Sequence, residues 1–324
     1  MSIFDKRTNY KPFEYPEIHQ FTDAINKSFW VHSEVDFTAD VQDFHSHLSA
    51  NEKQIVKKSL LAIAQIEVAV KSFWGDLYHH LPKPEFNGLG STFAECEFRH
   101  SEAYSRLLSV LGYNHEFEKL MEEPVIKKRF EYLSDALVFT KENDKKKYVF
   151  SLILFSILIE NVSLFSQFGI ILSFTRFRGL MKNVSNIIAW TSVDEQIHAN
   201  AGMYIVNEIK KEFPDFFDED TQIQIKDIVC HSIDVEAEIL DWIFEGGALD
   251  SISKTDLLNF MKFRADESLE KIGLGKIFHI SPEQYKPMQW FEEEIFANSL
   301  DDFFAKRPVD YTKHDKSIRA VDLF

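Results

Sequence analysis

The chain has 324 residues, of which 45% are hydrophobic, so it can fold around a large buried core and is not a disordered protein. Its 36 Lys and Arg against 52 Asp and Glu give a net charge of −16, which argues against nucleic-acid binding by charge. Only two cysteines, Cys96 and Cys230, are present, which excludes a disulfide framework and suits a reducing cytoplasm. The N-terminus shows no signal-peptide pattern, so we expect a cytoplasmic protein.

Apolar residues recur at helical spacing along the chain, and no convincing strand alternation is present. No proline occurs between Pro124 and Pro214, which favours long uninterrupted helices there. The pattern predicts the following helices, each with an error of a few residues at its ends: 51–80 with Asn51 as N-cap, 90–112, 115–141, 145–175, 183–211, and two or three more within 218–275. No linker divides them, so we expect one helical domain over residues 1–304.

The segment 148–175 is long and apolar enough to span a bilayer. It nevertheless contains Glu160, Asn161 and Gln167, and a carboxylate in mid-span costs about 2.5–3.5 kcal/mol. A helix that is apolar on all sides also occurs at the centre of large soluble bundles. We therefore predict a core helix and no membrane association.

The last part of the chain, residues 305–324, differs from the rest because it is polar and lacks periodicity. It ends in a small apolar cluster of Val321, Leu323 and Phe324. Such an end is typical of a flexible tail that carries a short motif for docking to a partner protein. A disordered terminus without a role is an equally simple interpretation.

Two Glu-x-x-His motifs, Glu97 to His100 and Glu195 to His198, are the strongest chemical signal in the sequence. Residues i and i+3 share one face of a helix, so each motif can offer a carboxylate and an imidazole to one ion. Glu67 and Glu160 add two carboxylates inside strongly apolar runs, where an ionised acid is usually paired or bound to metal.

The order along the chain is one helix carboxylate followed by one Glu-x-x-His helix, twice over. Four carboxylates and two imidazoles from four helices are the ligand set of ferritin-like di-metal proteins, and these donors suit iron or manganese. Taken singly, each residue has a simpler explanation as a core histidine or a buried salt bridge. The repeated pattern predicts an all-α, ferritin-like helical bundle with extra helices and two metal ions, bound by Glu67, Glu97, His100, Glu160, Glu195 and His198.

The sequence resembles the small subunits of class I ribonucleotide reductase in four separated segments. ECEFRHSEAY is similar to the family motif in which a tyrosine, here Tyr104, can hold a radical. VDEQIH matches the family's Asp-Glu-x-x-His, where the aspartate, here Asp194, bonds the metal-bound histidine. FWVHSEVDF and KRPVDY resemble the segments that carry a tryptophan and a tyrosine of the radical path, here Trp30 and Tyr311.

The resemblance implies a hydrogen-bonded chain in which Asp194 joins His100 to the indole of Trp30. Trp30 as a core aromatic and Tyr104 as a buried phenol remain the alternatives. Leu164 and Phe168 follow Glu160 by one and two turns and are candidates for the apolar wall of an oxygen pocket, or for ordinary core.

Lys71 lies four residues after Glu67 and departs from most iron-dependent members of the family. It resembles a manganese-using subclass, activated by superoxide, in which the dimanganese cluster itself stores the oxidising equivalent. We therefore favour dimanganese over di-iron, and the radical role of Tyr104 stays open. A lysine that reaches out to water is the alternative.

The resemblance implies that the chain is an oxidoreductase subunit that acts as a homodimer and passes an oxidising equivalent to a large catalytic subunit. That partner would reduce ribonucleotides to deoxyribonucleotides. Two rival hypotheses come from other classes of protein. One is a stand-alone di-metal oxidase or hydroxylase, which needs neither the tail nor Trp30. The other is an iron-storage protein, for which 324 residues are too many.

Overall fold

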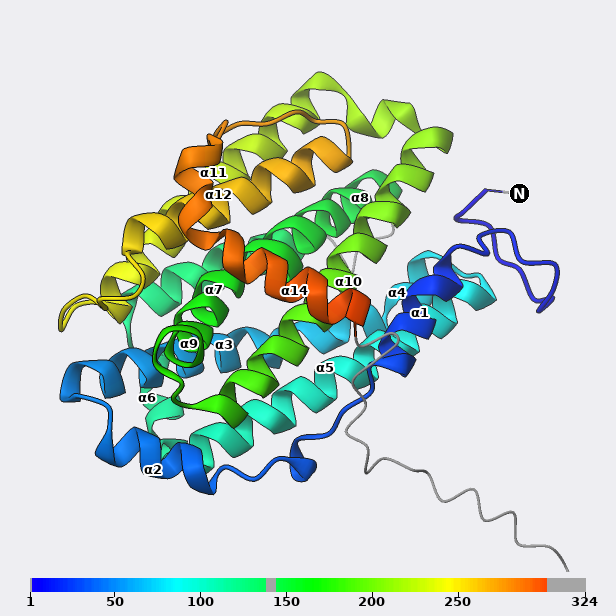
Figure 1. Cartoon of the computed structure of the whole chain (residues 1–324). Helices are drawn as coiled ribbons and strands as arrows, with labels where there is room; N and C mark the ends of the chain where they lie inside the picture. The colour runs from blue at the N-terminus through cyan, green and yellow to red at the C-terminus, as the bar shows by residue number, and fades with distance from the viewer. Residues whose placement is uncertain (1, 138–143, 302–324) are drawn as a thin grey trace, which may run out of the picture.

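The computed structural model describes residues 2–137 and 144–301, without the side chains of 68–71, 135–136 and 296–301, and all regular structure in these residues is helical. Four long elements form the centre of the molecule (Figure 1). They are α3 (Ala50–Gly75), α5 (Pro84–Val110), α10 (Lys182–Glu212) and a continuous run of α8 (Lys145–Leu154), the π-helix η4 (Phe155–Ser163) and α9 (Phe165–Arg178). Helix α3 packs along α5, while η4 and α9 pack on α10. The predicted all-helical fold is confirmed.

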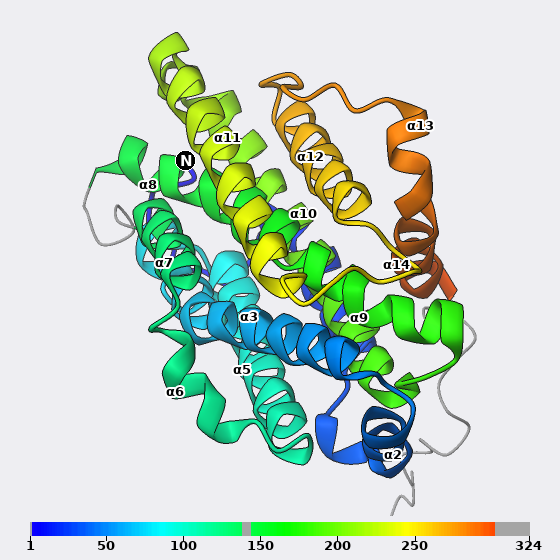
Figure 2. The same ribbon diagram turned by 90° about the vertical axis from the view of Figure 1, so that its left-hand side faces the viewer.

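The other helices cover this four-element core from outside. In Figure 2, α11 and α12 lie above α3 and α5. Helix α1 packs on α5, α11 on α7, α12 on η4 and α14 on α10. The bounds of the covering helices are α1 Ile18–Lys27, α2 Thr38–Ser46, α4 Leu77–His80, α6 Phe117–Leu120, α7 Pro124–Leu137, α11 Glu219–Ile243, α12 Lys254–Lys271, α13 Pro282–Tyr285 and α14 Gln289–Asp301.

Local capping signals fix where the ligand-bearing helices begin. The hydroxyl of Ser49 accepts a hydrogen bond from the backbone of Glu52, whose carboxylate accepts one from the backbone of Ser49. This capping box starts α3, so the predicted N-cap, Asn51, was wrong by two residues. Helix α5 starts at Pro84, six residues earlier than predicted, because proline fits the first helical position.

The predicted helix over 115–141 is also wrong, because the described part of this segment contains two helices. Helix α6 ends at Leu120 and α7 begins at Pro124. Proline lacks the N–H that a continuing helix needs, so it separates the two. Residues 138–143 lie outside the described part of the chain.

The start of α10 is held by α2. Asp40 accepts hydrogen bonds from the backbone N–H groups of Asn183 at 2.8 Å and Val184 at 2.9 Å. A carboxylate in this place satisfies the free N–H groups of the first turn and favours the positive end of the helix dipole. The contact fixes the axis of the helix that carries the second Glu-x-x-His motif.

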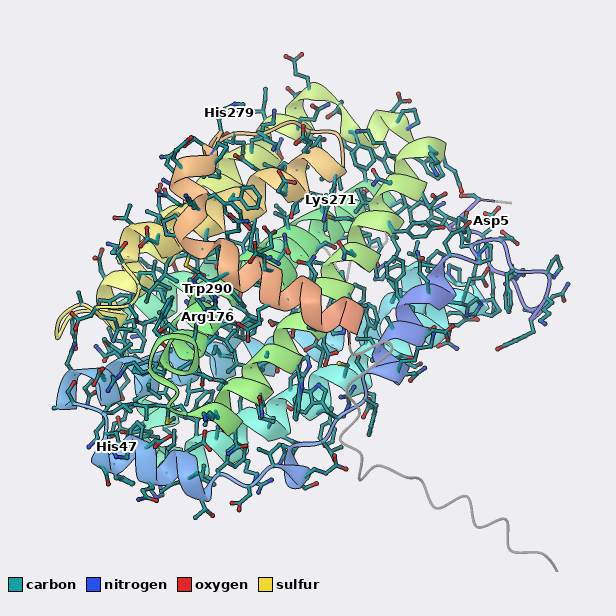
Figure 3. The ribbon with its side chains drawn as sticks, viewed as in Figure 1. Asp5, His47, Arg176, Lys271, His279 and Trp290 are labelled. Carbon is teal, nitrogen blue, oxygen red and sulfur yellow. The ribbon has the colours of Figure 1, made fainter. Side chains whose placement is uncertain are left out.

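The apolar helix Lys145–Arg178 is the one described helix that is long and apolar enough to cross a membrane, and 94% of its most apolar window is buried inside the protein. It therefore occupies the position expected of a core helix. Polar side chains such as Asp5, His47 and Lys271 lie instead at the outside of the molecule (Figure 3). The predicted tail, residues 305–324, and its Tyr311 lie outside the described residues.

Candidate metal centre

Six acidic and imidazole side chains from four different elements meet in the centre of the bundle. Each is at most 1% exposed, so the cluster is sealed from solvent. Helix α3 contributes one ligand candidate, α5 two, η4 one and α10 two: Glu67, Glu97, His100, Glu160, Glu195 and His198. The i, i+3 spacing on α5 and α10 places each histidine beside the carboxylate of its own motif.

These side chains form two overlapping groups. The first group contains Glu67, Glu97, His100 and Glu195, and the second contains Glu97, Glu160, Glu195 and His198; within each group the donor atoms lie within 4.8 Å of one another. Glu195 Oε1 is 3.0 Å from His100 Nδ1, whereas its Oε2 is 3.4 Å from His198 Nδ1. Glu97 is shared in the same way, with Oε2 3.4 Å from His100 Nδ1 and Oε1 2.8 Å from His198 Nδ1. Each shared carboxylate thus offers one oxygen to each group.

Burial controls the protonation of this cluster. It raises the pKa of Glu67 well above the ordinary 4.5, and the nearby Glu97 and Glu195 add to the effect against the pull of His100. Burial and the neighbouring Glu195 likewise hold the pKa of Glu160 well above its ordinary value. Four carboxylates cannot all remain ionised in so small a space unless cations neutralise them.

The donor atoms of this cluster fit a pair of metal ions. Both oxygens of Glu67, both of Glu97 and both ring nitrogens of His198 have no partner in hydrogen-bonding geometry among the described residues. Leaving a buried polar atom unsatisfied costs about 1–3 kcal/mol, so such atoms normally have a ligand. Carboxylate oxygens and imidazole nitrogens are donors that iron and manganese accept. The two groups therefore make up a candidate di-metal site, whose donors do not distinguish between these metals.

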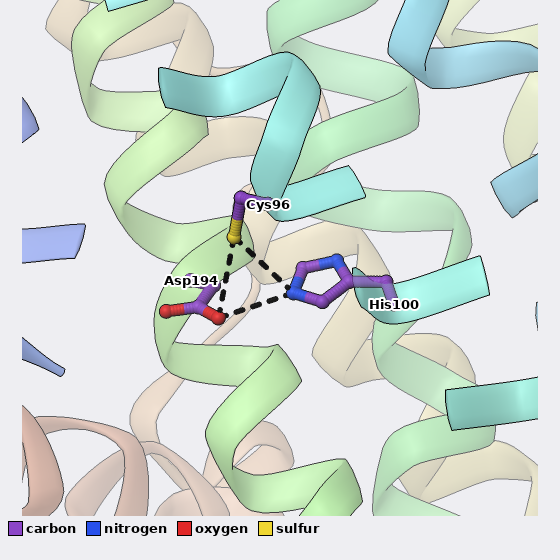
Figure 4. Close-up of side chains that lie close together, drawn as sticks. All are labelled: Cys96, His100 and Asp194. Atoms are coloured by element: carbon purple, nitrogen blue, oxygen red, sulfur yellow. Dashed lines mark hydrogen bonds and ion pairs between the residues drawn. The ribbon is translucent and has the colours of Figure 1, made fainter. Parts of the chain in front are cut away.

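Asp194 lies directly behind His100 (Figure 4). Its Oδ2 atom is 3.1 Å from His100 Nε2, the ring nitrogen that faces away from the two groups. Cys96 Sγ lies 3.4 Å from the same Oδ2 atom and 3.5 Å from His100 Nε2. An imidazole that donates its Nε2–H to a carboxylate keeps Nδ1 unprotonated and available as a ligand.

Trp30 extends this contact toward the outside of the bundle. Its indole Nε1–H donates to Asp194 Oδ2 at 2.9 Å, and its ring stacks on that of His100 with centroids 5.7 Å apart. Arg99 fixes the neighbouring backbone by donating to the carbonyl of Trp30 at 3.0 Å. The structure thus brings Trp30, Asp194 and His100 into one connected chain.

The remaining predicted site residues differ in what the structure describes. Tyr104 is 1% exposed on α5, and burial, reinforced by Glu67, raises its pKa well above the ordinary value of 10.0. The side chain of Lys71 and all of Tyr311 lie outside the described residues. Leu164 and Phe168 are buried in the apolar core, which agrees with either of the two interpretations given for them.

Sequence reasoning missed two side chains that contact the cluster. Trp74 is fully buried and donates its indole N–H to Glu160 Oε1 at 2.7 Å. Its position seven residues after Glu67, two helical turns along the same face of α3, was the available signal. Cys96 precedes Glu97 but points to Asp194, and nothing in the sequence predicts that contact.

Comparison with known proteins agrees with this geometry. A family model described as ribonucleotide reductase, small chain, matches residues 7–287. The probable ribonucleoside-diphosphate reductase small subunit 048L of Invertebrate iridescent virus 3 is 26% identical, over 97% of this chain and 86% of that protein. The ribonucleoside-diphosphate reductase subunit beta of Halalkalibacterium halodurans is 24% identical, over 88% of this chain and 83% of that protein.

Among solved structures, the chain resembles the dimanganese(II)-NrdF of Streptococcus sanguinis. The TM-score is 0.75 and the identity 17%, over 91% of this chain and 99% of that one. At this identity the likeness shows the fold, which is the predicted ferritin-like bundle.

Proposed function

The chain belongs to the ribonucleotide reductase small-chain family and is the small subunit of a class I ribonucleotide reductase, and on this premise we propose which of its residues hold and serve the metal pair. Glu67 and His100 would hold one ion and Glu160 and His198 would hold the other, while Glu97 and Glu195, which belong to both groups, would offer an oxygen to each. The sharing of these two carboxylates between the groups carries this proposal. When bound, the metal pair generates and stores the oxidising equivalent with which the large subunit reduces ribonucleotides.

Residues behind the ligands orient them. Asp194 holds His100 with Nδ1 toward the first group by accepting from Nε2. Trp74 holds one oxygen of Glu160 by donating to Oε1, which leaves Oε2 turned toward His198 at 3.5 Å. The apolar rings around the site, such as Phe93 at 4.1 Å from the His198 ring, exclude water.

Trp30 is the first redox-active group on the path that leads out of the bundle. If its indole gives an electron to the oxidised site, the Nε1 proton can move to Asp194 Oδ2 at 2.9 Å, so the indole is left as a neutral radical and not as a radical cation. Tyr311 is proposed as the later relay, next to the large subunit. Tyr104 and Lys71 are the other two residues proposed to serve the metal pair. Tyr104 is the alternative place for a stored radical.

Manganese is the proposed metal, with iron as the alternative. The presence of Lys71, which resembles the pattern of a manganese-using subclass, supports manganese. The structurally similar protein from Streptococcus sanguinis is described as a dimanganese(II) protein. Elemental analysis with EPR of the activated protein tests this point. A sharp tyrosyl doublet beside an iron pair would refute manganese, whereas a multiline dimanganese spectrum without that doublet supports it.

Small subunits of this class act with a large catalytic subunit. We propose that the contact is made by the tail, residues 305–324, and that the subunit is a cytoplasmic homodimer. The net charge of −16 and the scarcity of cysteine are compatible with this environment. Size-exclusion chromatography of the purified chain tests the dimer.

Deletion of residues 305–324 tests the function directly. In the presence of a large subunit, the truncated chain should keep its two metal ions and lose ribonucleotide reduction. A stand-alone oxidase or hydroxylase would keep its turnover after the same deletion, and that outcome would contradict the proposal.

A further inference from the structure

The π-helix η4 carries Glu160 and ends three residues later at Ser163. In a π-helix the hydrogen bonds shift from i→i+4 to i→i+5, which turns some backbone carbonyls out of the ladder. Two backbone carbonyls of η4 accept hydrogen bonds from buried arginines of other helices. Arg264 on α12 donates to Asn161 O through Nε at 2.7 Å, and Arg129 on α7 donates to Ser163 O.

Arg264 is unusual because its described hydrogen-bond partners are all neutral. Its guanidinium donates to the carbonyl and side-chain oxygens of Asn161 and, through Nη2, to Gln196 Oε1 at 2.9 Å. One face lies over the Phe165 ring, 3.4 Å from its centroid. Arg129, by comparison, pairs with the carboxylate of Glu236 at 2.9 Å. Burial lowers the pKa of Arg264 to about 9, so the side chain is held in this place at a cost.

The hydrogen-bond partners of Arg264 are the direct neighbours of two ligand candidates. Asn161 directly follows Glu160 in η4, and Gln196 directly follows Glu195 in α10. A rigid guanidinium fork therefore connects the backbone of η4 at Asn161 to the side chain of Gln196 on α10, next to each of these carboxylates. Asn161 is locked further by donating to Ser268 Oγ, one turn beyond Arg264 on α12, at 2.5 Å.

We propose that Arg264 is a positioning residue for the second group, holding Glu160 and Glu195 at the separation that one of the two metal ions requires. The inference rests on the di-metal site proposed above. The first group has its own support, since Asp194 orients His100. Arg264 contacts the neighbours of two members of the second group, Glu160 and Glu195, but of the first group only the neighbour of the shared Glu195, so its loss should weaken the ion of the second group more than the other.

Stepwise titration of the metal-free protein with Mn(II), followed by EPR, tests this inference. Wild-type protein should bind two ions per chain and show the coupled dimanganese spectrum at saturation. Arg264→Gln should retain one ion near wild-type affinity and bind the other about 10–100-fold more weakly, as is typical when a group that supports a ligand is lost. Its spectrum at the same Mn(II) concentration should be the six-line signal of an isolated ion.

Two more variants separate charge from geometry and protect the test if Arg264→Gln does not fold. Gln196→Leu leaves Arg264 bonded to Asn161 but removes the tie to α10, so it should weaken the same ion. Arg264→Lys keeps the charge, but one ammonium cannot replace the fork, so it should stay defective. Arg7→Gln is the control, because Arg7 in the N-terminal segment is also buried and pairs with Glu85 in the first turn of α5, and it has no described contact with the second group.

Each outcome decides one question. Wild-type protein that binds fewer than two ions would contradict the proposed function itself. If wild type binds two ions and Arg264→Gln binds both with unchanged affinity, only the inference about Arg264 is wrong. Arg264→Gln could instead bind both ions equally weakly and show the same fall in melting temperature as Arg7→Gln. That result would assign Arg264 a purely structural role and would also contradict the inference.

Discussion

Asp194 joins two side chains that have different tasks, because its Oδ2 atom accepts hydrogen bonds from both Trp30 and His100. His100 faces the metal site, whereas Trp30 lies on the outward side of the contact. Removing the indole N–H should therefore affect the transfer of the oxidising equivalent and leave metal binding intact. A substitution of Trp30 can therefore separate the two tasks.

Trp30→Phe keeps an aromatic ring but removes the donor and the oxidisable indole. We expect reductase turnover with a large subunit to fall by about 10²-fold or more, the scale at which a positioned proton-transfer group contributes. Metal content per chain should not change. Trp190→Phe is the matched control, since Trp190 packs against the Trp30 ring with centroids 5.6 Å apart. Equal reductase turnover in the two variants would show that Trp30 does not take part in transferring the oxidising equivalent.

Glu67 and Glu160 should give the metal-free protein a distinctive dependence on pH. Burial raises the pKa of each carboxyl above the ordinary 4.5, so the folded chain binds more protons than the unfolded chain. The stability that these groups contribute is complete below pH 4.5 and is lost as the pH rises through their folded-state pKa values. Metal binding displaces these protons, so affinity should rise about tenfold per pH unit for each proton displaced.

The measurement is the melting temperature of metal-free protein, together with the Mn(II) dissociation constant, between about pH 6 and about pH 8. We expect the melting temperature to fall and the affinity to rise over this interval. The Glu67→Gln/Glu160→Gln double variant cannot titrate at these positions and should show a flatter melting profile. A melting temperature of the wild-type, metal-free protein that increases with pH would contradict the assigned protonation.

Sequence reasoning located the six side chains of the cluster because each of them carries one of two kinds of signal. Glu97 and Glu195 stand three residues before a histidine, and Glu67 and Glu160 are acids in runs that must be buried. Trp74 carries neither signal, since a tryptophan in an apolar run is ordinary core. Its contact with Glu160 depends on how α3 packs against η4, which one sequence does not specify.

Helix α10 approaches η4 closely at one glycine. A Cβ atom at Gly202 would lie 2.7 Å from Ser156 Cβ and closer still to its hydroxyl. Only glycine permits this distance between the helices that carry Glu160, Glu195 and His198. The close approach is therefore part of the geometry of the second group.

Gly202→Ala should push α10 away from η4, lower the free energy of unfolding by about 1–3 kcal/mol and weaken Mn(II) binding. Gly88→Ala is the control, because an added Cβ on that exposed face of α5 meets nothing within 4 Å. It should leave binding unchanged and raise stability by about 0.5–1 kcal/mol. Ser156→Gly combined with Gly202→Ala restores the space and should recover binding. A Gly202→Ala protein that binds both ions normally would show that the close approach is dispensable.

The predicted helix boundaries were accurate in some places but missed others that the sequence marks, such as the capping box at Ser49 and the proline that starts α5. The start of α10 at Lys182 is within one residue of the prediction. The π-helix η4 was not predicted, because its composition equals that of the α-helices on either side. Two of its carbonyls accept hydrogen bonds from Arg129 and Arg264, which lie far away in sequence. Sequence periodicity contains no information about such partners.

The four central elements of the molecule pack together around the candidate metal site. Each supplies at least one ligand candidate, so the site exists only when all four are packed together. The bundle was predictable because four acids and two histidines on different helices can be buried together only if those helices converge. The division into residues 1–304 and a tail of residues 305–324 stays a prediction, because the tail lies outside the described residues.

The most direct test of this account is anomalous diffraction from crystals of the Mn(II)-loaded chain. We predict two peaks per chain in the anomalous difference map, one beside His100 Nδ1 and one beside His198 Nδ1, with Glu97 and Glu195 touching both. A single peak, or two peaks that share no carboxylate, would contradict the bridged di-metal site on which the proposed function depends.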